Sequence, residues 1–192
     1  MIQNIEEFYF KNDKDWRKWL HTNYSSSSGI YLIFYKIHHP MPSMRWEEAV
    51  KVALCYGWID STVKSLGDGK RRQYFCKRKA KSVWSKVNKN HLKELKVSGL
   101  IHESGLMSIS IAKKNGSWTA LDDVENGVIP NDLQIAFHQN EKAFSNYQRF
   151  TRGLRKSYLY WLHQAIKEET RQKRITEIVS LCEQGIKSRN TR

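Results

Sequence analysis

Cysteine and long apolar runs are scarce in this chain of 192 residues. Its three cysteines, Cys55, Cys76 and Cys182, are far apart and show no spacing of a disulfide framework or a zinc site. No apolar run reaches the roughly 18 residues of a membrane span, and the first residues lack the basic and apolar regions of a secretory signal. We therefore expect a cytoplasmic protein with reduced thiols and no membrane span.

Patterns that bind metals or cofactors are also missing. Among the seven histidines, only His38 and His39 lie close together in the sequence. Adjacent residues on a loop point in different directions and make a poor ligand pair. The sequence predicts neither a metal site nor a cofactor.

Acidic residues are few, 19 against 33 Lys and Arg, which gives a net charge of +14. The excess lies in two blocks. Residues 70–89 hold nine basic residues and no acid, and residues 149–192 hold eleven against four. Such blocks are typical of a surface for an anionic partner, either a small molecule or a polyanion. A basic surface that only maintains solubility is the alternative interpretation.

Hydrophobic residues (40%) and aromatic residues (12%) are frequent enough for a folded core. We expect an α+β fold: a small mixed sheet with packed helices over residues 1–117, followed by an all-helical region over residues 118–192. In the second region, two apolar stripes at helical spacing predict an αα-hairpin. The stripes are Leu154, Tyr158, Trp161, Leu162 and Ala165, and then Ile175, Ile178, Val179 and Cys182.

Alternating patterns and capping residues predict the elements of the first region. Residues 30–37 read as a strand covered on both faces, and residues 58–63 and 72–77 as a hairpin with its turn near Asp68. Helices are expected after Asn12 or Asp13, after Ser43, after Ser82 or Ser85, and from Ser104. The helix after Ser43 has an apolar stripe of Trp46, Ala49, Val50, Ala53 and Leu54 and ends at Gly57.

The hairpin brings several polar and aromatic residues together. Trp58 and Asp60 share one face of their strand, and a turn about Asp68 pairs residues whose numbers sum to about 136. This register sets Arg78 near Trp58 and Cys76 opposite Asp60. The predicted ligand site consists of Trp58, Asp60, Arg78, Ser82, Trp84, Ser85 and Asn88. The alternative is a purely structural set of contacts between the hairpin and its neighbours.

Two chemical interpretations apply to this region. The helix start at Ser82, Ser85 and Asn88 follows several lysines and suits an anion, although the serines also serve as ordinary caps. Cys55 and Asp60 are the candidate catalytic residues if the protein is an enzyme. Cys55 is otherwise a small packing residue, because the negative end of a helix disfavours a thiolate.

A nucleic-acid-binding module is a further alternative, because Tyr74, Phe75 and Trp84 are interleaved with the basic residues of the first block.

Several motifs resemble those of the YdeI/OmpD-associated, or bacteriocin-protection, proteins. They are ALCYGWID at residues 53–60, Phe75 with Arg78, SVWSKVN at residues 82–88, the run from Gly99 to Trp118, and residues 169–175. The resemblance implies a role in stress or in tolerance of bacteriocins and antimicrobial peptides, but no defined chemistry. Because a strongly basic protein repels cationic peptides, direct sequestration of such peptides is not expected.

Overall fold

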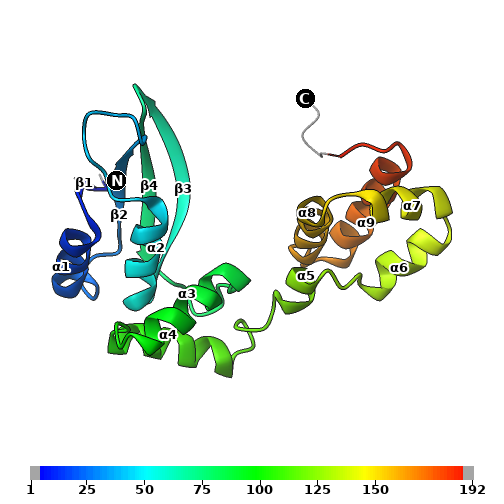
Figure 1. The fold of residues 1–192 in the computed structure, drawn as a ribbon. Helices are drawn as coiled ribbons and strands as arrows, with labels where there is room; N and C mark the ends of the chain where they lie inside the picture. The colour runs from blue at the N-terminus through cyan, green and yellow to red at the C-terminus, as the bar shows by residue number, and fades with distance from the viewer. Residues whose placement is uncertain (1–4, 188–192) are drawn as a thin grey trace. The chain divides into compact units, whose positions relative to one another are not determined.

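The computed structural model describes residues 5–187, and the chain divides into an N-terminal unit, residues 1–119, and a C-terminal unit, residues 120–192. The sequence prediction placed this division after residue 117. Among the described residues, all strands lie in the N-terminal unit, whereas the C-terminal unit is helical (Figure 1). The predicted α+β class is confirmed.

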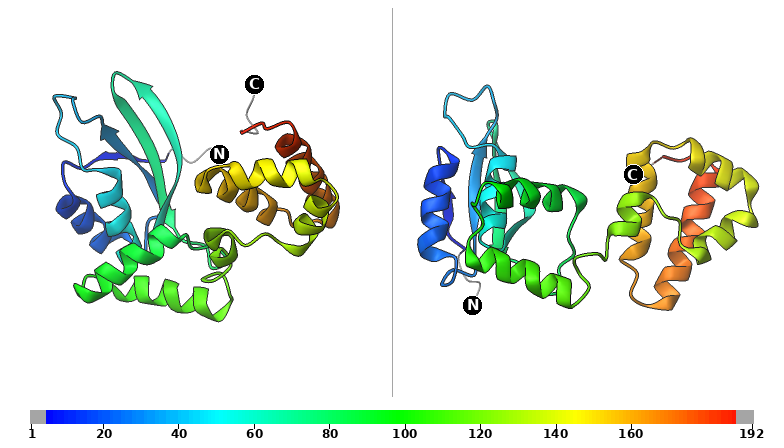
Figure 2. Two further views of the ribbon diagram at one scale, coloured as in Figure 1. Left: turned by 45° about the vertical axis from the view of Figure 1, so that its right-hand side comes forward. Right: turned by 60° about the horizontal axis from the view of Figure 1, so that its bottom comes forward.

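The N-terminal unit contains a four-stranded mixed sheet of order β1-β2-β4-β3. The strands are β1 (Glu7–Tyr9), β2 (Gly29–Tyr35), β3 (Trp58–Gly67) and β4 (Lys70–Lys77). β1 runs parallel to β2, and the other neighbours are antiparallel. The β3-β4 hairpin turns at Asp68, whose φ of 46° lies in the left-handed region that aspartate tolerates better than most residues. Its tip extends past the start of α2 (Trp46–Cys55) (Figures 1 and 2).

One face of the sheet carries the core. Ile30, Leu32 and Phe34 alternate along β2 and pack with buried residues of α1 (Asp13–Asn23) and α2. On the other face Ile33 is buried, but Tyr31 and Tyr35 are only half-buried, so the predicted cover on both faces is only partly present.

Helix α2 starts later than the sequence suggests. Arg45, and not Ser43, is the N-cap, and the Arg45 N–H donates to Glu48 Oε2 at 2.7 Å. The Ser43 hydroxyl instead accepts the N–H of Tyr35 at 3.2 Å. Trp46 is the first residue of α2 and is 43% exposed. The sequence analysis placed it in an apolar stripe that was expected to be buried.

Two further helices, α3 (Lys86–Val97) and α4 (Glu103–Lys114), complete the N-terminal unit. Ser85 rather than Ser82 caps α3, and the cap of α4 is His102, whose Nδ1 accepts the Ser104 N–H at 3.2 Å. α4 lies against the end of α2, where Gly105 faces the Cys55 carbonyl.

The C-terminal unit consists of α5 (Asp122–Asn126), α6 (Asn131–His138), α7 (Glu141–Arg149), α8 (Arg152–His163) and α9 (Glu168–Glu183) (Figure 2). α8 and α9 form the predicted αα-hairpin, with Tyr158, Leu162, Ile175, Ile178 and Cys182 buried. A bidentate pair between Arg171 and Asp132, with contacts of 2.5 and 3.0 Å, links α9 to α6. Within residues 5–187 no helix combines the length and apolar character that a membrane crossing requires.

Candidate functional site

The two tryptophans of the predicted ligand site lie in the core. Trp58 is 0% exposed and Trp84 is 1% exposed. The Trp58 ring meets Trp16 edge-on, and its Nε1 donates to the Tyr24 carbonyl at 3.2 Å. Trp84 packs against Trp118 with ring centroids 5.2 Å apart. Their burial speaks against the prediction that Trp58 and Trp84 belong to a ligand site.

The hairpin has the predicted register near its turn, but a β-bulge changes the register on the side away from the turn. Val63 pairs with Gln73, which agrees with the predicted sum, but the register shifts between Asp60 and Val63. Asp60 consequently pairs with Phe75 and not with Cys76. A β-bulge adds one residue to one strand, and local sequence gives little sign of it.

Asp60 holds the exposed Trp46 in place. Its Oδ2 accepts from Trp46 Nε1 at 2.9 Å and also from Gln73 Nε2. No ion pair joins Asp60 to Arg78 in the described part of the chain, although the carboxylate favours the charged form of that guanidinium. Asp60 thus has a positioning role toward Trp46 in this structure.

Arg78, Ser82 and Trp84 do come together. The Arg78 guanidinium carbon lies 3.6 Å from the centre of the Trp84 ring, and Nη1 donates to Ser82 Oγ at 2.8 Å and to the Val83 carbonyl at 3.2 Å. Burial lowers the pKa of Arg78 to about 10, against the opposing effect of Asp60. Arg78 therefore remains a cation at neutral pH and clamps the segment that precedes α3.

Ser85 and Asn88 form the start of α3. The Ser85 hydroxyl accepts the Asn88 N–H at 3.3 Å, which is an ordinary N-cap contact. Ligand binding by Arg78, Ser82, Ser85 and Asn88 stays a prediction, whereas their structural contacts are present.

Cys55 is a packing residue in this structure. It is 0% exposed, and burial raises the pKa of its thiol, although Arg17 Nη2 at 3.4 Å from Sγ partly opposes the rise. The thiol donates to the Lys51 carbonyl at 3.3 Å. A protonated, covered thiol is a poor nucleophile. Across residues 5–187, no group of three or more His, Cys, Asp or Glu side chains could hold a metal ion.

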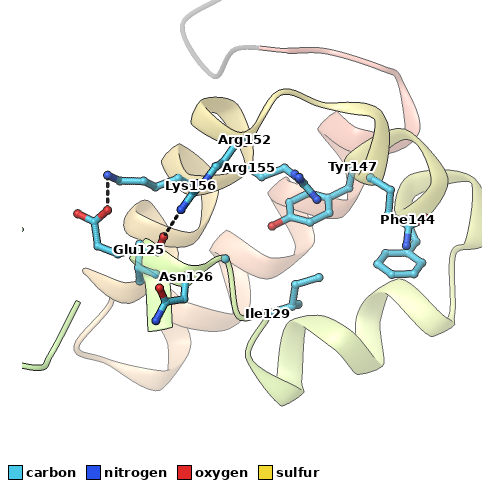
Figure 3. Close-up of a pocket in the computed structure, with 11 residues that line it drawn as sticks. Glu125, Asn126, Ile129, Phe144, Tyr147, Arg152, Arg155 and Lys156 are labelled. Atoms are coloured by element: carbon cyan, nitrogen blue, oxygen red, sulfur yellow. Dashed lines mark hydrogen bonds and ion pairs between the residues drawn. The ribbon is translucent and has the colours of Figure 1, made fainter. Parts of the chain in front are cut away.

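A cationic pocket of about 200 Å³ lies in the C-terminal unit (Figure 3). The start of α8 supplies Arg152, Arg155 and Lys156, which share one helix face at i, i+3 and i+4. The end of α5 and its following loop form one wall, and Phe144 and Tyr147 of α7 form another. We name this the α8 pocket.

One carboxylate balances these three cations. Glu125 is 7% exposed, and its side chain accepts from Lys156 Nζ at 2.6 Å. The Glu125 carbonyl oxygen accepts from Arg152 Nη2 at 3.2 Å. These contacts fix the ends of both side chains, and the lining of the pocket keeps a surplus of positive charge.

Arg155 and Tyr147 lie side by side in the α8 pocket (Figure 3). Burial raises the pKa of Tyr147 to about 12, although Arg155 partly opposes this rise. Tyr147 is therefore a neutral phenol, and at 1% exposure it is part of the packed wall of the pocket. In the part of the chain that the structure describes, the Arg155 guanidinium makes no hydrogen bond or ion pair.

Family models divide the chain as the fold does. The model described as a domain of unknown function (DUF8412) matches residues 8–108, more than half of the chain. The chain belongs to the DUF8412 family. A second model, described as bacteriocin-protection, YdeI or OmpD-associated, matches residues 126–185. No curated protein and no solved structure matches the chain.

The second match confirms the resemblance to YdeI/OmpD-associated proteins in the C-terminal unit. It includes the motif at residues 169–175 and most of the α8 pocket. The ALCYGWID and SVWSKVN motifs instead lie in the DUF8412 match.

Sequence reasoning missed the α8 pocket. Its signal was present in the second basic block, where Arg152, Arg155 and Lys156 have helical spacing. Glu125 of α5 and Tyr147 of α7 line the same pocket, and only the tertiary fold of the C-terminal unit brings them to the cations.

Proposed function

We propose that the protein binds a small anionic molecule in the α8 pocket. One observation carries the proposal: three cations and a single carboxylate line the same small cavity. The carboxylate is already engaged with Lys156, so an incoming anion meets a surplus of positive charge. Charge-assisted hydrogen bonds from guanidinium groups are among the stronger polar contacts in proteins.

The lining also indicates the kind of anion. Arg155 offers donors, whereas Phe144 and Ile129 offer apolar contact on the same cavity. An anion with a small apolar group uses both kinds of wall. We therefore expect phenyl phosphate to bind more tightly than inorganic phosphate.

Isothermal titration calorimetry with inorganic phosphate and phenyl phosphate tests the site. Arg155→Gln should weaken both by about 10- to 100-fold, because it removes a charged donor. Arg149→Gln is the matched control, since Arg149 is an exposed arginine of α7 that does not line the pocket. Equal affinities in the wild type and Arg155→Gln, or no binding of either probe at millimolar concentration, would contradict the proposal.

The cellular role that we propose is tolerance of stress or of bacteriocins and antimicrobial peptides, exercised in the cytoplasm through the bound anion. The match over residues 126–185 supports it by its description. In a strain that lacks the protein, the wild type and Arg149→Gln should restore bacteriocin tolerance, and Arg155→Gln should not. Full rescue by Arg155→Gln would separate the role from the pocket.

A further inference from the structure

A larger groove of about 760 Å³ lies in the N-terminal unit, at the turn of the β3-β4 hairpin. Phe34, Val63 and Arg71 from three neighbouring strands line it, and so do Arg45 and Trp46 at the start of α2. The segment after β2, residues 36–38, adds a further wall. We name this the hairpin groove. All of its lining residues lie within the DUF8412 match.

The groove exposes a fixed aromatic side chain. Trp46 is 43% exposed, and its Nε1 donates to Asp60 Oδ2 at 2.9 Å. Gln73 holds the same carboxylate oxygen from the neighbouring strand. The indole is thus held by its polar edge while part of its surface remains open. Ile37 and Val63, 70% and 53% exposed, extend the apolar lining.

The same groove is strongly basic. Its lining holds four cations and one carboxylate, which are Lys36, Arg45, Lys70, Arg71 and Asp68. Within residues 5–187 none of the four cations takes part in an ion pair.

The nearby acids, Glu47 and Glu48 of α2 and Asp60 of β3, form no ion pair with these cations within residues 5–187. Glu47 pairs with Lys51 at 3.1 Å, and Glu48 accepts the backbone N–H of Arg45. Asp60 is already engaged by Trp46 and Gln73. The Arg71 guanidinium carbon lies 5.5 Å from the centre of the Phe34 ring. Both residues line the groove.

We propose that the hairpin groove binds a free anion with a flat aromatic body, and specifically a nucleoside monophosphate. The base stacks on Trp46, and the phosphate contacts the cations around Arg71. Stacking on an aromatic side chain accepts any base, and arginine suits phosphate geometry. This site is separate from the α8 pocket, because the two cavities belong to different units.

Calorimetry with AMP, adenosine and decanoate tests the assignment on the full chain. We expect AMP to bind more tightly than adenosine or decanoate. Trp46→Leu should weaken AMP by roughly tenfold or more through lost stacking, and Arg71→Gln should weaken it by a similar factor. Tyr160→Leu and Arg149→Gln, exposed residues outside the groove, are the matched controls and should leave AMP affinity unchanged.

Crossed variants keep the two sites distinguishable. Arg155→Gln should leave AMP binding intact, and Arg71→Gln should leave phenyl phosphate binding intact. If Trp46→Leu fails to fold, the exposed Arg71 still provides the test. AMP affinity unchanged in Arg71→Gln, or decanoate that binds more tightly than AMP, would overturn the assignment. So would a ten-residue oligoadenylate that binds the groove more tightly than AMP, because the occupant would then be a nucleic acid.

Discussion

Arg78 illustrates how a partly buried charged residue can pack against the core without an ionic partner. Its guanidinium stacks on Trp84 and donates to two oxygens of the segment that it clamps. Burial lowers its pKa, but a value of about 10 still leaves it charged at neutral pH. The stacked plane and the fork of donors explain why arginine suits this position better than lysine.

At the scale of single residues, the three thiols should react in a definite order. Cys55 and Cys182 are fully buried and burial raises the pKa of both, that of Cys182 to about 12. Cys76 is only half-buried, and Lys79 and Arg78 oppose the rise of its pKa. At a pH below the pKa, each unit by which the pKa of a thiol rises lowers its thiolate fraction about tenfold. Iodoacetamide at pH 7.5 should therefore label Cys76 first.

Mass spectrometry of the alkylated peptides measures this order. The unfolded protein in urea is the control, because all three thiols should then react at similar rates. Rapid labelling of Cys55 in the folded protein would revive the interpretation of Cys55 as a catalytic nucleophile. Slow labelling leaves Cys55 as a packing residue beneath Arg17.

At the scale of elements, the contact between α2 and α4 depends on a glycine. A Cβ at Gly105 would lie 2.3 Å from the Cys55 carbonyl oxygen, which belongs to backbone and cannot swing away. In α8, a Cβ at Gly153 meets nothing within 4 Å. Gly105→Ala should destabilise the protein by about 1–3 kcal/mol through overpacking. Gly153→Ala should stabilise it by about 0.5–1 kcal/mol through helix propensity.

Chemical unfolding in urea, followed by circular dichroism, measures both changes. The opposite signs are the internal control, since both substitutions add the same methyl group to a helix. A neutral Gly105→Ala would show that α4 can move away from α2 without cost. The packing of these two helices would then not depend on the close approach.

Local signals in the sequence predicted several elements well. Asn12 and Ser85 are caps because their side chains accept N–H groups only three residues ahead. The start of α2 was mispredicted, since the Arg45 N–H is satisfied by Glu48 and Ser43 is used by β2. The exposure of Trp46 was not predicted either. Helical spacing cannot show that the first turn of a helix extends beyond the buried core.

Contacts between elements far apart in the chain could not be predicted from the sequence. The bulge between Asp60 and Val63 shifted the partners of Trp58 and Asp60 by one residue. The α8 pocket needs Glu125 of α5 and Tyr147 of α7, and no spacing in the sequence relates them to Arg155. The charge blocks located the basic residues along the chain, but not the cavities that those residues line.

At the scale of the whole molecule, the core cluster, the two cavities and the two family matches each lie within one of the two units, residues 1–119 or 120–192. The largest core cluster holds residues only up to Trp118, and every lining residue of the α8 pocket lies after Ala120. A unit with its own core and its own cavity has the parts that independent folding requires.

We therefore expect fragments 1–119 and 120–192 to fold separately. The C-terminal fragment should be the less stable, because a small domain buries a smaller fraction of its surface. Far-UV circular dichroism should show a helical spectrum with a cooperative melt for fragment 120–192, which should retain phenyl phosphate binding. Fragment 1–119 should retain AMP binding and lack phenyl phosphate binding. If fragment 120–192 is unfolded while the full chain binds phenyl phosphate, the α8 pocket depends on residues before Ala120, and independence of the two units is wrong.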